Sequence, residues 1–339
     1  MYDAMMRDIA SATTNIRMES YIFASDVVGR RIAGALTAQA RRGRRVDLRV
    51  DYAGSRLELD ETLVRELRAT GVRFEWSRRW EWLKPWEFHR RNHRKLLVVD
   101  DAIAYTGGFN VHAVSSRRAV GASRWRDSHV RFEGPAVRQA ADIFDGSSDG
   151  APNHRGAASP LSLIPNTTRR CRWRLRCEFD RVMGAARERI WLTTPYFIPD
   201  RRLLRRLVHA ARRGVDVRVL TPAKSDVSIA RWAARASYAR LLQHGVRLYE
   251  YQPRILHAKT MLVDDTWATL GTANFDYRSL FVNAEVNVIA RSKRFCEDLA
   301  QHFCADLESS CEVRLEDLGQ WSWWGRVREA FAWRLRRWL

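Results

Sequence analysis

The sequence predicts an α/β fold made of two similar halves that share one active site. Three observations support this prediction: the chain of 339 residues repeats itself, short β-branched runs alternate with helical stretches, and each half holds one copy of the motif His-x-Lys-x4-Asp. Glycines at the ends of the helical stretches complete a pattern that is typical of α/β units with largely parallel strands. Because each half supplies only half of the chemistry, we expect the two halves to work as one unit.

Each half begins with a short apolar strand, followed by a basic helical stretch and a second strand. A second helical stretch then leads to a Gly-Val-Arg strand, and the motif comes after it. The matching segments, first half then second, are ESYIFASD (19–26) and TPYFIPD (194–200), RRGRRVDLRVD (41–51) and RRGVDVRVL (212–220), and TGVRFEW (70–76) and HGVRLYE (244–250). The same order of elements in both halves indicates a duplicated unit.

A polar stretch rich in Gly, Ser and Pro separates the halves at 145–160 and reads as a surface connection. We therefore expect a first lobe over 1–150, a second lobe over 160–318, and a basic amphipathic helix over 319–339. The stretch 1–23 contains acidic residues and no long apolar core, so it does not resemble a signal peptide. The sequence contains no run of about 18 apolar residues, so no membrane-spanning helix is expected. We expect the protein to remain in the cytoplasm.

The formal net charge of +20 predicts a polyanionic partner, which leaves nucleic acid, an anionic membrane surface and anionic phosphate substrates as candidates. Nearly all basic residues are Arg. The chain has only five lysines, and two of them, Lys95 and Lys259, stand at the third position of the two motifs. These positions therefore favour a compact ammonium over a planar guanidinium.

Both copies of the motif extend to the same longer pattern, H-x-K-x4-D-x6-G-x2-N. Its members, first copy then second, are His93 and His257, Lys95 and Lys259, Asp100 and Asp264, Gly107 and Gly271, and Asn110 and Asn274. Two copies that agree in every offset are not a chance match. The histidine and lysine are two residues apart, so on a strand they point to the same face.

These residue types suit phosphoryl transfer without a metal or other cofactor. One neutral imidazole can attack phosphorus, while a second, protonated imidazole gives a proton to the leaving alcohol. Paired lysines and asparagines can hold the charged phosphoryl oxygens through the transition state. Asp101 and Asp265, which follow the motif aspartates, leave a metal site as the alternative.

The duplicated motif resembles that of the phospholipase D superfamily, and the resemblance covers nearly the whole chain. It implies two similar lobes, each a mixed sheet flanked by helices, with the active site at their interface and a phosphohistidine intermediate. It also implies an acidic residue downstream of each motif that orients a catalytic histidine. Glu285 in NAEVNV fits this role in the second half. Asp127 in WRDSHV is the candidate in the first half, although it comes six residues later relative to its motif.

Within the superfamily the chain is most similar to bacterial cardiolipin synthases, in the branch without N-terminal membrane-spanning helices. The stretches that support this are ESYIF, TGGFN, WRDSHVRFEGPAV, TTPYFIPD and GTANFDYRS. The resemblance implies anionic phospholipid substrates, phosphatidyl transfer to a second lipid, and a peripheral position on the cytoplasmic face of the bacterial inner membrane. The alternatives are a hydrolytic phospholipase D, a nuclease, and a non-catalytic lipid- or nucleic-acid-binding protein. Two intact motifs argue against the last.

An insert of about ten residues precedes the first motif and mixes aromatic with basic side chains. Its members are Trp76, Arg78, Arg79, Trp80, Trp82, Lys84, Trp86 and Phe88. Tryptophan beside basic residues suits the lipid head-group region, and packing against the other lobe is the alternative interpretation. The insert suits lipid better than a groove that follows a nucleic-acid backbone, which makes a nuclease less expected.

The C-terminal sequence WSWWGRVREAFAWRLRRWL predicts a basic amphipathic helix that lies on a membrane. Its apolar face consists of Trp324, Val327, Phe331, Leu335 and Trp338. Arg326, Arg336 and Arg337 lie off that face, and Trp333 points away from it. Docking on the protein's own core is the alternative. Other potentially functional residues, namely His112, His129, His154 and the five cysteines, are expected to be structural.

Overall fold

The computed structural model describes residues 1–79, 88–147, 160–319 and 323–335. The first lobe contains the strands β1 (Asn15–Ser20), β2 (Arg45–Asp51), β3 (Arg73–Ser77), β4 (Leu96–Val99), β5 (Ile103–Gly107) and β6 (His129–Glu133). Its helices are α1 (Tyr2–Ala10), α2 (Val27–Arg41), α3 (Tyr52–Ser55), α4 (Glu61–Ala69), α6 (Arg117–Val120) and α7 (Pro135–Asp145), with 3₁₀ turns η1 (Ala113–Ser115) and η2 (Gly121–Ser123).

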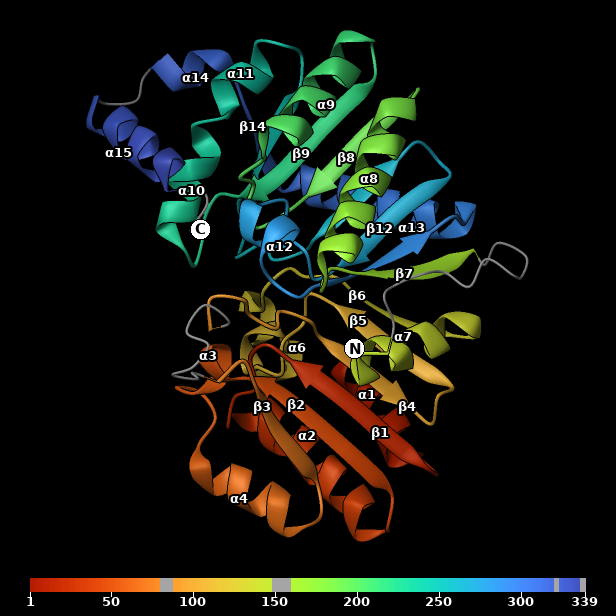
Figure 1. Ribbon diagram of the computed structural model, residues 1–339. Helices are drawn as coiled ribbons and strands as arrows, with labels where there is room; N and C mark the ends of the chain where they lie inside the picture. The colour runs from red at the N-terminus through yellow and green to blue at the C-terminus, as the bar shows by residue number, and fades with distance from the viewer. Residues whose placement is uncertain (80–87, 148–159, 320–322, 336–339) are drawn as a thin grey trace.

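The second lobe repeats this order. Its strands are β7 (Leu161–Pro165), β8 (Arg189–Thr193), β9 (Asp216–Pro222), β10 (Arg247–Tyr251), β11 (Thr260–Val263), β12 (Trp267–Gly271), β13 (Val286–Ala290) and β14 (Ser310–Val313). Its helices are α8 (Arg169–Ala185), α9 (Arg201–Arg212), α10 (Ser228–Arg235), α11 (Tyr238–Leu242), α12 (Tyr277–Phe281), α13 (Lys293–Glu308), α14 (Leu315–Gly319) and α15 (Trp323–Arg334). The two lobes stack on each other, the first in red to yellow and the second in green to blue (Figure 1).

Each lobe is built on a mixed sheet. Within the described residues the strand orders are β3-β2-β1-β4-β5-β6 and β14-β10-β9-β8-β11-β12-β13-β7. The first three strands of each repeat are parallel, and the last three run antiparallel to their neighbours. The predicted two-lobed α/β architecture of mixed sheets is confirmed. The prediction of largely parallel strands holds only for the first three strands of each repeat. The connection from β4 to β5 is too short for the crossover that parallel neighbours need, so these two strands are antiparallel.

Aspartates at matching positions cap α2 and α9, the helices that follow β1 and β8. Asp26 ends the segment ESYIFASD, and its Oδ1 accepts from the backbone amides of Val28 and Gly29 at 2.8 and 3.0 Å. Asp200 ends TPYFIPD and accepts from the amides of Arg202 and Leu203 at 3.1 and 2.7 Å. These caps satisfy amides that have no partner inside the helix. They therefore fix where each chain leaves the end of its strand, next to the motif.

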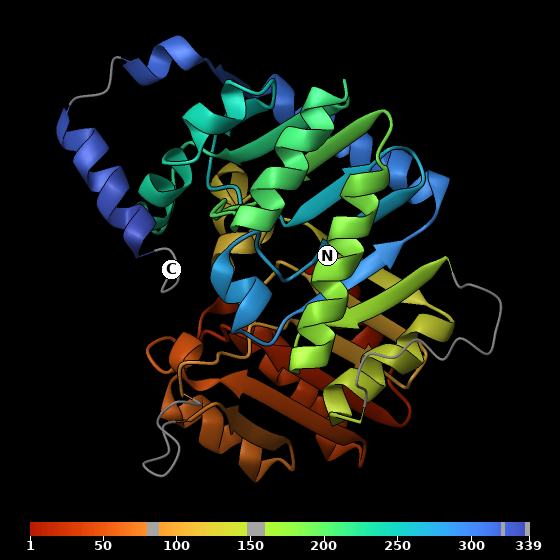
Figure 2. The ribbon, with the colours of Figure 1, turned by 45° about the horizontal axis from the view of Figure 1, so that its top comes forward.

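Helices bury both faces of each sheet. In the first lobe α1, α2 and α4 cover one face, and α7 covers the other, where it also packs on β7 and β13 of the second lobe. In the second lobe α8, α9 and α11 cover one face and α13 the other. The two views of Figures 1 and 2 agree that α7 and β7 lie between the lobes. An apolar cluster shared by both lobes thus holds the two motif strands at a fixed separation.

The C-terminal helix α15 packs against α10 at the edge of the second lobe (Figure 1). Ala332 is fully buried there, and Trp333 packs on the same cluster. The neighbouring Phe331 is 60% exposed. Among the described residues, the structure contains no helix of a length and apolarity that would cross a membrane.

Candidate active site

Two short backbone bridges join the lobes and bring the motifs together. The segment before the first motif is extended, and it pairs in parallel with Ala284 of the second lobe at Asn92. The segment before the second motif pairs in the same way, Leu256 with Arg126 of the first lobe. The amide of His93 donates to the Ala284 carbonyl at 2.9 Å, and that of His257 donates to the Arg126 carbonyl at 2.7 Å. Each motif is thus anchored to the opposite lobe.

The carboxylates that orient the two histidines are exchanged between the lobes. Nδ1 of His93 lies 2.9 Å from Oε2 of Glu285, and Nδ1 of His257 lies 2.6 Å from Oδ2 of Asp127. Both carboxylate side chains are fully buried. A carboxylate at Nδ1 fixes the ring and its tautomer, which leaves Nε2 of each histidine for the substrate. The structure therefore contains two oriented imidazoles in one site.

Asp127 and Glu285 occupy equivalent places despite their different offsets in the sequence. In the first lobe Gly107 pairs with His129, and in the second lobe Gly271 pairs with Asn287. Each acid lies two residues before that partner. The connection runs from 107 to 129 in the first lobe and from 271 to 287 in the second, which makes it six residues longer in the first. That difference equals the shift of Asp127 in the sequence.

Glycine at the shared motif position allows the strand that follows to approach closely. A Cβ on Gly107 would meet the Ser128 carbonyl oxygen at 2.5 Å, and one on Gly271 would meet the Val286 carbonyl oxygen at 2.5 Å. Gly107 also has a φ of +147°, which disfavours any side chain. The two glycines thus let the acid-bearing segments lie against the motif strands.

The two motif lysines lie beside the histidines of their own motifs and are almost fully buried. Lys95 is 2% exposed and donates from Nζ to the His93 carbonyl at 2.8 Å, and Lys259 is 1% exposed and donates to the His257 carbonyl. Burial lowers the pKa of Lys95 to about 7, against the opposing effect of Glu285. Burial lowers the pKa of Lys259 to about 8, against that of Asp127. The anionic charge of a phosphate would stabilise both ammonium groups.

The buried surroundings of the site favour neutral histidines. Burial lowers the pKa of His93 to about 4, although the Glu285 carboxylate acts in the opposite direction. Burial and then Lys259 lower the pKa of His257, and Asp127 opposes them. Burial alone would raise the pKa of Asp127, but Lys259 and His257 bring it below its ordinary value. Asp127 can therefore accept a hydrogen bond as a carboxylate.

The structure does not bring Asp100 and Asp264 into this cluster. They follow β4 and β11 at the ends opposite the lysines, with positive φ angles of 54° and 51°. The carboxylate of Asp100 accepts from the amides of Thr13, Thr14 and Asn15 at 2.7 to 3.0 Å. Burial opposes ionisation of Asp100, yet these bonds lower its pKa. Asp264 accepts in the same way from the amides of residues 187–189.

The aspartates that follow the motifs form ion pairs with arginines. Asp101 lies 2.8 Å from Arg17, and Asp265 pairs with Arg189. In the part of the chain that the structure describes, no group of three His, Cys, Asp or Glu side chains is arranged to hold a metal ion.

The motif asparagines are buried beside the strand ends. Asn110 is 7% exposed, and its Oδ1 accepts from the amide of Ile22 at 3.1 Å. Asn274 is 5% exposed, and its Oδ1 has no hydrogen-bond partner among the described residues. Asn274 also contacts Asp276, whose pKa burial raises to about 6. The second asparagine thus has hydrogen-bonding capacity that a ligand could satisfy.

Sequence reasoning missed the aromatic side chains beside the histidines. The Tyr21 ring packs edge-on to His93 with 4.9 Å between ring centroids, and Nζ of Lys95 lies 5.2 Å from the Tyr21 ring. Trp125 packs against His257 at 5.3 Å. Both lie in stretches that carry the family resemblance, ESYIF and WRDSHV, which is the signal that could have identified them.

The other histidines lie outside the pair of catalytic candidates. His129 is half-buried beside the first motif; burial lowers its pKa to about 3, and its Nδ1 accepts from the Phe109 amide at 3.3 Å. His112 accepts from the Val114 amide at 3.1 Å and begins η1. His154 lies outside the described residues, as do Trp80, Trp82, Lys84 and Trp86 of the insert.

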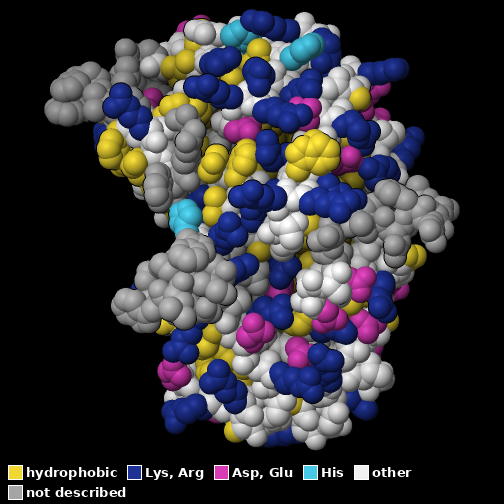
Figure 3. All heavy atoms as spheres, viewed as in Figure 1, with side chains coloured by type: hydrophobic (Ala, Val, Ile, Leu, Met, Phe, Trp, Pro, Cys, Tyr) yellow, Lys and Arg dark blue, Asp and Glu magenta, His cyan; other side chains and the backbone are white. Residues whose placement is uncertain are grey.

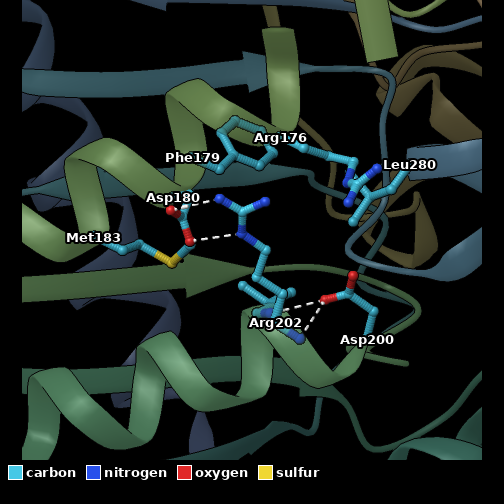
Figure 4. Close-up of a pocket in the computed structure, with 8 residues that line it drawn as sticks. Arg176, Phe179, Asp180, Met183, Asp200, Arg202 and Leu280 are labelled. Carbon is cyan, nitrogen blue, oxygen red and sulfur yellow. Dashed lines mark hydrogen bonds and ion pairs between the residues drawn. The ribbon is translucent and has the colours of Figure 1, made fainter. Parts of the chain in front are cut away.

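A separate small pocket lies between α8 and the start of α9 (Figure 4). Asp180 projects into it and forms an ion pair with Arg202 at 2.8 Å and with Arg206 at 2.5 Å. Its lining contains none of the motif residues. It is therefore not part of the candidate site.

Comparisons with known proteins agree with this geometry. The model of the cardiolipin synthase, phospholipase D-like domain family matches residues 5–141 and 180–307. A cardiolipin synthase of Clostridium perfringens (strain SM101) is 30% identical over 97% of this chain and 73% of its own length. Cardiolipin synthase 1 of Bacillus cereus is 32% identical over 97% of this chain and 69% of its own length. The crystal structure of phosphatidylserine synthase from Haemophilus influenzae superimposes with a TM-score of 0.72 at 13% identity, covering 100% of this chain and 93% of that one.

Proposed function

This chain belongs to the phospholipase D-like family of cardiolipin synthases, and we propose that it joins two molecules of phosphatidylglycerol through a phosphohistidine. It is a phosphatidyltransferase, because the relatives that match nearly the whole of this chain are cardiolipin synthases. The observation that supports the mechanism is the pair of histidines, each oriented at Nδ1 by a carboxylate from the opposite lobe. The two steps below assign a role to each group.

In the first step His93 acts as the nucleophile and His257 as the general acid. Nε2 of His93 attacks the phosphorus of the donor lipid, and the bond from phosphorus to the oxygen of the head-group glycerol breaks. The electron pair of that bond goes to the glycerol oxygen, which takes the proton from Nε2 of His257. Lys95 and Lys259 hold the phosphoryl oxygens, and the phosphatidyl group stays on His93.

In the second step the roles of the groups reverse. His257, now neutral, removes the proton from a glycerol hydroxyl of the second phosphatidylglycerol. That oxygen attacks phosphorus, and the bond from phosphorus to Nε2 of His93 breaks with its electron pair returning to the imidazole. Cardiolipin leaves, and His257 is again protonated for the next cycle. Atoms balance as two phosphatidylglycerols giving one cardiolipin and one glycerol.

The electrostatics of the site support these roles. A pKa of about 4 keeps His93 neutral, as a nucleophile must be, at any pH near neutrality. The closer carboxylate contact, 2.6 Å, belongs to His257, the residue that must carry a positive charge before it protonates the leaving glycerol in the first step. Binding of the anionic donor phosphate beside His257 raises its affinity for that proton. The same phosphate stabilises the charge of Lys95 and Lys259.

We place the protein on the cytoplasmic face of the bacterial inner membrane, bound peripherally to anionic lipid. The net charge of +20 supports attraction to such a surface, and basic side chains spread over both lobes in Figure 3. Phe331 of α15 is 60% exposed, as an interfacial side chain would be.

The test is product analysis after incubation of purified protein with labelled phosphatidylglycerol in vesicles. We expect labelled cardiolipin and one glycerol for each cardiolipin formed. Formation of phosphatidic acid alone would identify a hydrolytic phospholipase D. Cleavage of DNA or RNA that requires both His93 and His257, without any lipid product, would identify a nuclease.

A further inference from the structure

Arg91 lies on the same side of the chain as the first histidine and lysine. The segment that contains it is extended and pairs with the second lobe at Asn92, so side chains two residues apart point in the same direction. Arg91, His93 and Lys95 follow this spacing. The Arg91 carbonyl accepts from the Ala284 amide at 2.9 Å, just as the Ile255 carbonyl of the second lobe accepts from Arg126 at 2.8 Å. A cation in one lobe thus corresponds to an isoleucine in the other.

The Arg91 guanidinium is buried and only partly satisfied. Arg91 is 7% exposed, and its Nε and Nη1 have no hydrogen-bond partner among the described residues. Its Nη2 donates to the Arg78 carbonyl at 2.5 Å, and its Nε lies 3.8 Å from Oδ2 of Asp51, beyond hydrogen-bond distance. That Asp51 oxygen already accepts from the Asn92 amide at 2.8 Å. Nitrogens of a buried cation that lack a hydrogen bond are costly unless a ligand binds them.

A second arginine reaches the same place from the other lobe. Arg278, on α12, donates from Nη2 to the His89 carbonyl at 3.0 Å. Both Arg91 and Arg278 lie within electrostatic reach of the Tyr21 hydroxyl, and the Tyr21 ring packs on His93. Burial lowers the pKa of Arg91, and Asp51 only partly opposes this. The two guanidinium groups therefore create a positive region beside the nucleophile.

We propose that Arg91 and Arg278 form a second phosphate subsite, which binds the phosphodiester of the accepting phosphatidylglycerol. This inference rests on the proposed function. The acceptor carries its own phosphate one glycerol away from the hydroxyl that attacks phosphorus on His93. Residues two apart on an extended chain are separated by roughly 6.6 Å, which matches a glycerol bridge between two phosphates. Water has no such phosphate, so the subsite favours transfer to a lipid over hydrolysis.

The test is the substitution Arg91→Ile, which introduces in the first lobe the residue type found at the equivalent position, Ile255, of the second lobe. The wild type and the variant receive labelled phosphatidylglycerol, and the ratio of cardiolipin to phosphatidic acid is measured in each reaction. Loss of a charge-assisted hydrogen bond predicts a fall in this ratio of about ten- to a hundredfold. The apparent KM for the acceptor lipid should rise, while transfer to ethanol, which has no phosphate, should stay near the wild-type rate.

Two controls separate a subsite from a structural role. Arg90→Gln removes the same charge from the exposed neighbouring residue and should leave the ratio unchanged. Arg91→Lys keeps a charge and should restore part of the ratio. Because both products form in one reaction, their ratio does not depend on how much protein folds.

Two results would overturn the subsite. One is an unchanged ratio in Arg91→Ile, and the other is an equal loss of transfer to lipid, ethanol and water. If wild-type protein forms neither cardiolipin nor phosphatidic acid, the proposed function itself fails, and the subsite fails with it.

Discussion

The two lobes present the same reactive groups but differ in the side chains around them. His93 and His257 have matching backbone bridges, and each is bonded at Nδ1 to a carboxylate of the opposite lobe. Around them, Arg91 in the first lobe corresponds to Ile255 in the second, and His129 corresponds to Asn287. Duplication thus provides a symmetric pair of histidines, and the surrounding differences can give the two histidines different tasks.

The two orienting acids show how the lobes reach the same geometry by different packing. Asp127 has the shorter side chain, and Gly108 leaves space for it, since a Cβ there would lie 2.0 Å from its Oδ1. At the equivalent position the second lobe has Thr272, whose hydroxyl donates to Glu285 at 2.6 Å. Each acid therefore fits only its own surroundings. Exchanging the two acids is not expected to be neutral.

The strongest test of the symmetry removes each histidine in turn. His93→Ala and His257→Ala should each lower turnover of phosphatidylglycerol by at least about 10³-fold, since one removes the nucleophile and the other the proton donor. With a nitrophenyl phosphodiester, whose leaving group needs no proton, His257→Ala should still form the phosphoenzyme on His93. Rapid quench and peptide mapping measure this. Label at position 257 would reverse the assignment, and full activity in either variant would refute the mechanism.

Neutral replacements of the acids test the exchange between lobes. Glu285→Gln and Asp127→Asn keep the shape of each side chain but lose the charge that orients the histidine, so turnover should fall by about 10² to 10⁴-fold. Glu285→Gln should slow formation of the phosphoenzyme, although Glu285 belongs to the other lobe. Asp127→Asn should spare it with the nitrophenyl substrate. Single-turnover kinetics distinguish the two, and equal effects on both steps would contradict the separate roles.

The buried lysines predict a dependence on pH. Lys95 and Lys259 have pKa values lowered to about 7 and about 8, so they lose charge as the pH rises through that range, and kcat/KM should fall. Lys95→Arg should lose about ten- to a hundredfold in activity, because a planar head replaces a compact ammonium. It should also move the fall of kcat/KM to higher pH. If kcat/KM falls at the same pH in both Lys→Arg variants as in the wild type, another group causes the fall.

The helix α15 offers a comparison within the second lobe. Phe331 is exposed and Trp333 is packed on α10, so Phe331→Ser should weaken binding to anionic vesicles about tenfold or more and leave the fold intact. Trp333→Ala should instead loosen the helix. Vesicle co-sedimentation and thermal melting measure the two effects. If Phe331→Ser does not change vesicle binding, the proposal that this helix lies on the membrane is wrong.

The motif aspartates should have the smallest effect on catalysis. Asp100→Ala removes the acceptor for the amides of residues 13–15 and should lower the free energy of unfolding by about 1–3 kcal/mol. Turnover per folded molecule should change little. Because these bonds lower the pKa of Asp100, its contribution is present above the ordinary carboxyl pKa and is lost as the pH falls below it. Loss of turnover without loss of stability would show that Asp100 takes part in catalysis.

The sequence by itself was sufficient for the repeat, the mixed two-lobed fold and the family. Equal offsets in two motif copies identify the histidines and lysines, because a strand places residues two apart on one face. A helix begins where Asp26 or Asp200 caps it, and that local rule can also be read from the sequence. Asp100 and Asp264 share the same offsets, but equal spacing cannot separate a residue that reacts from one that holds a turn.

Only the tertiary structure decided which acid orients which histidine. Glu285 lies 192 positions from His93, and Asp127 lies 130 positions from His257. Contacts at such separations arise when the lobes pack, since α7, β7 and β13 bury an apolar cluster between them. No local pattern in the chain encodes that packing. The same packing leaves Arg91 buried with two nitrogens that lack a hydrogen bond within the described residues, because burial depends on the neighbours that the other lobe supplies.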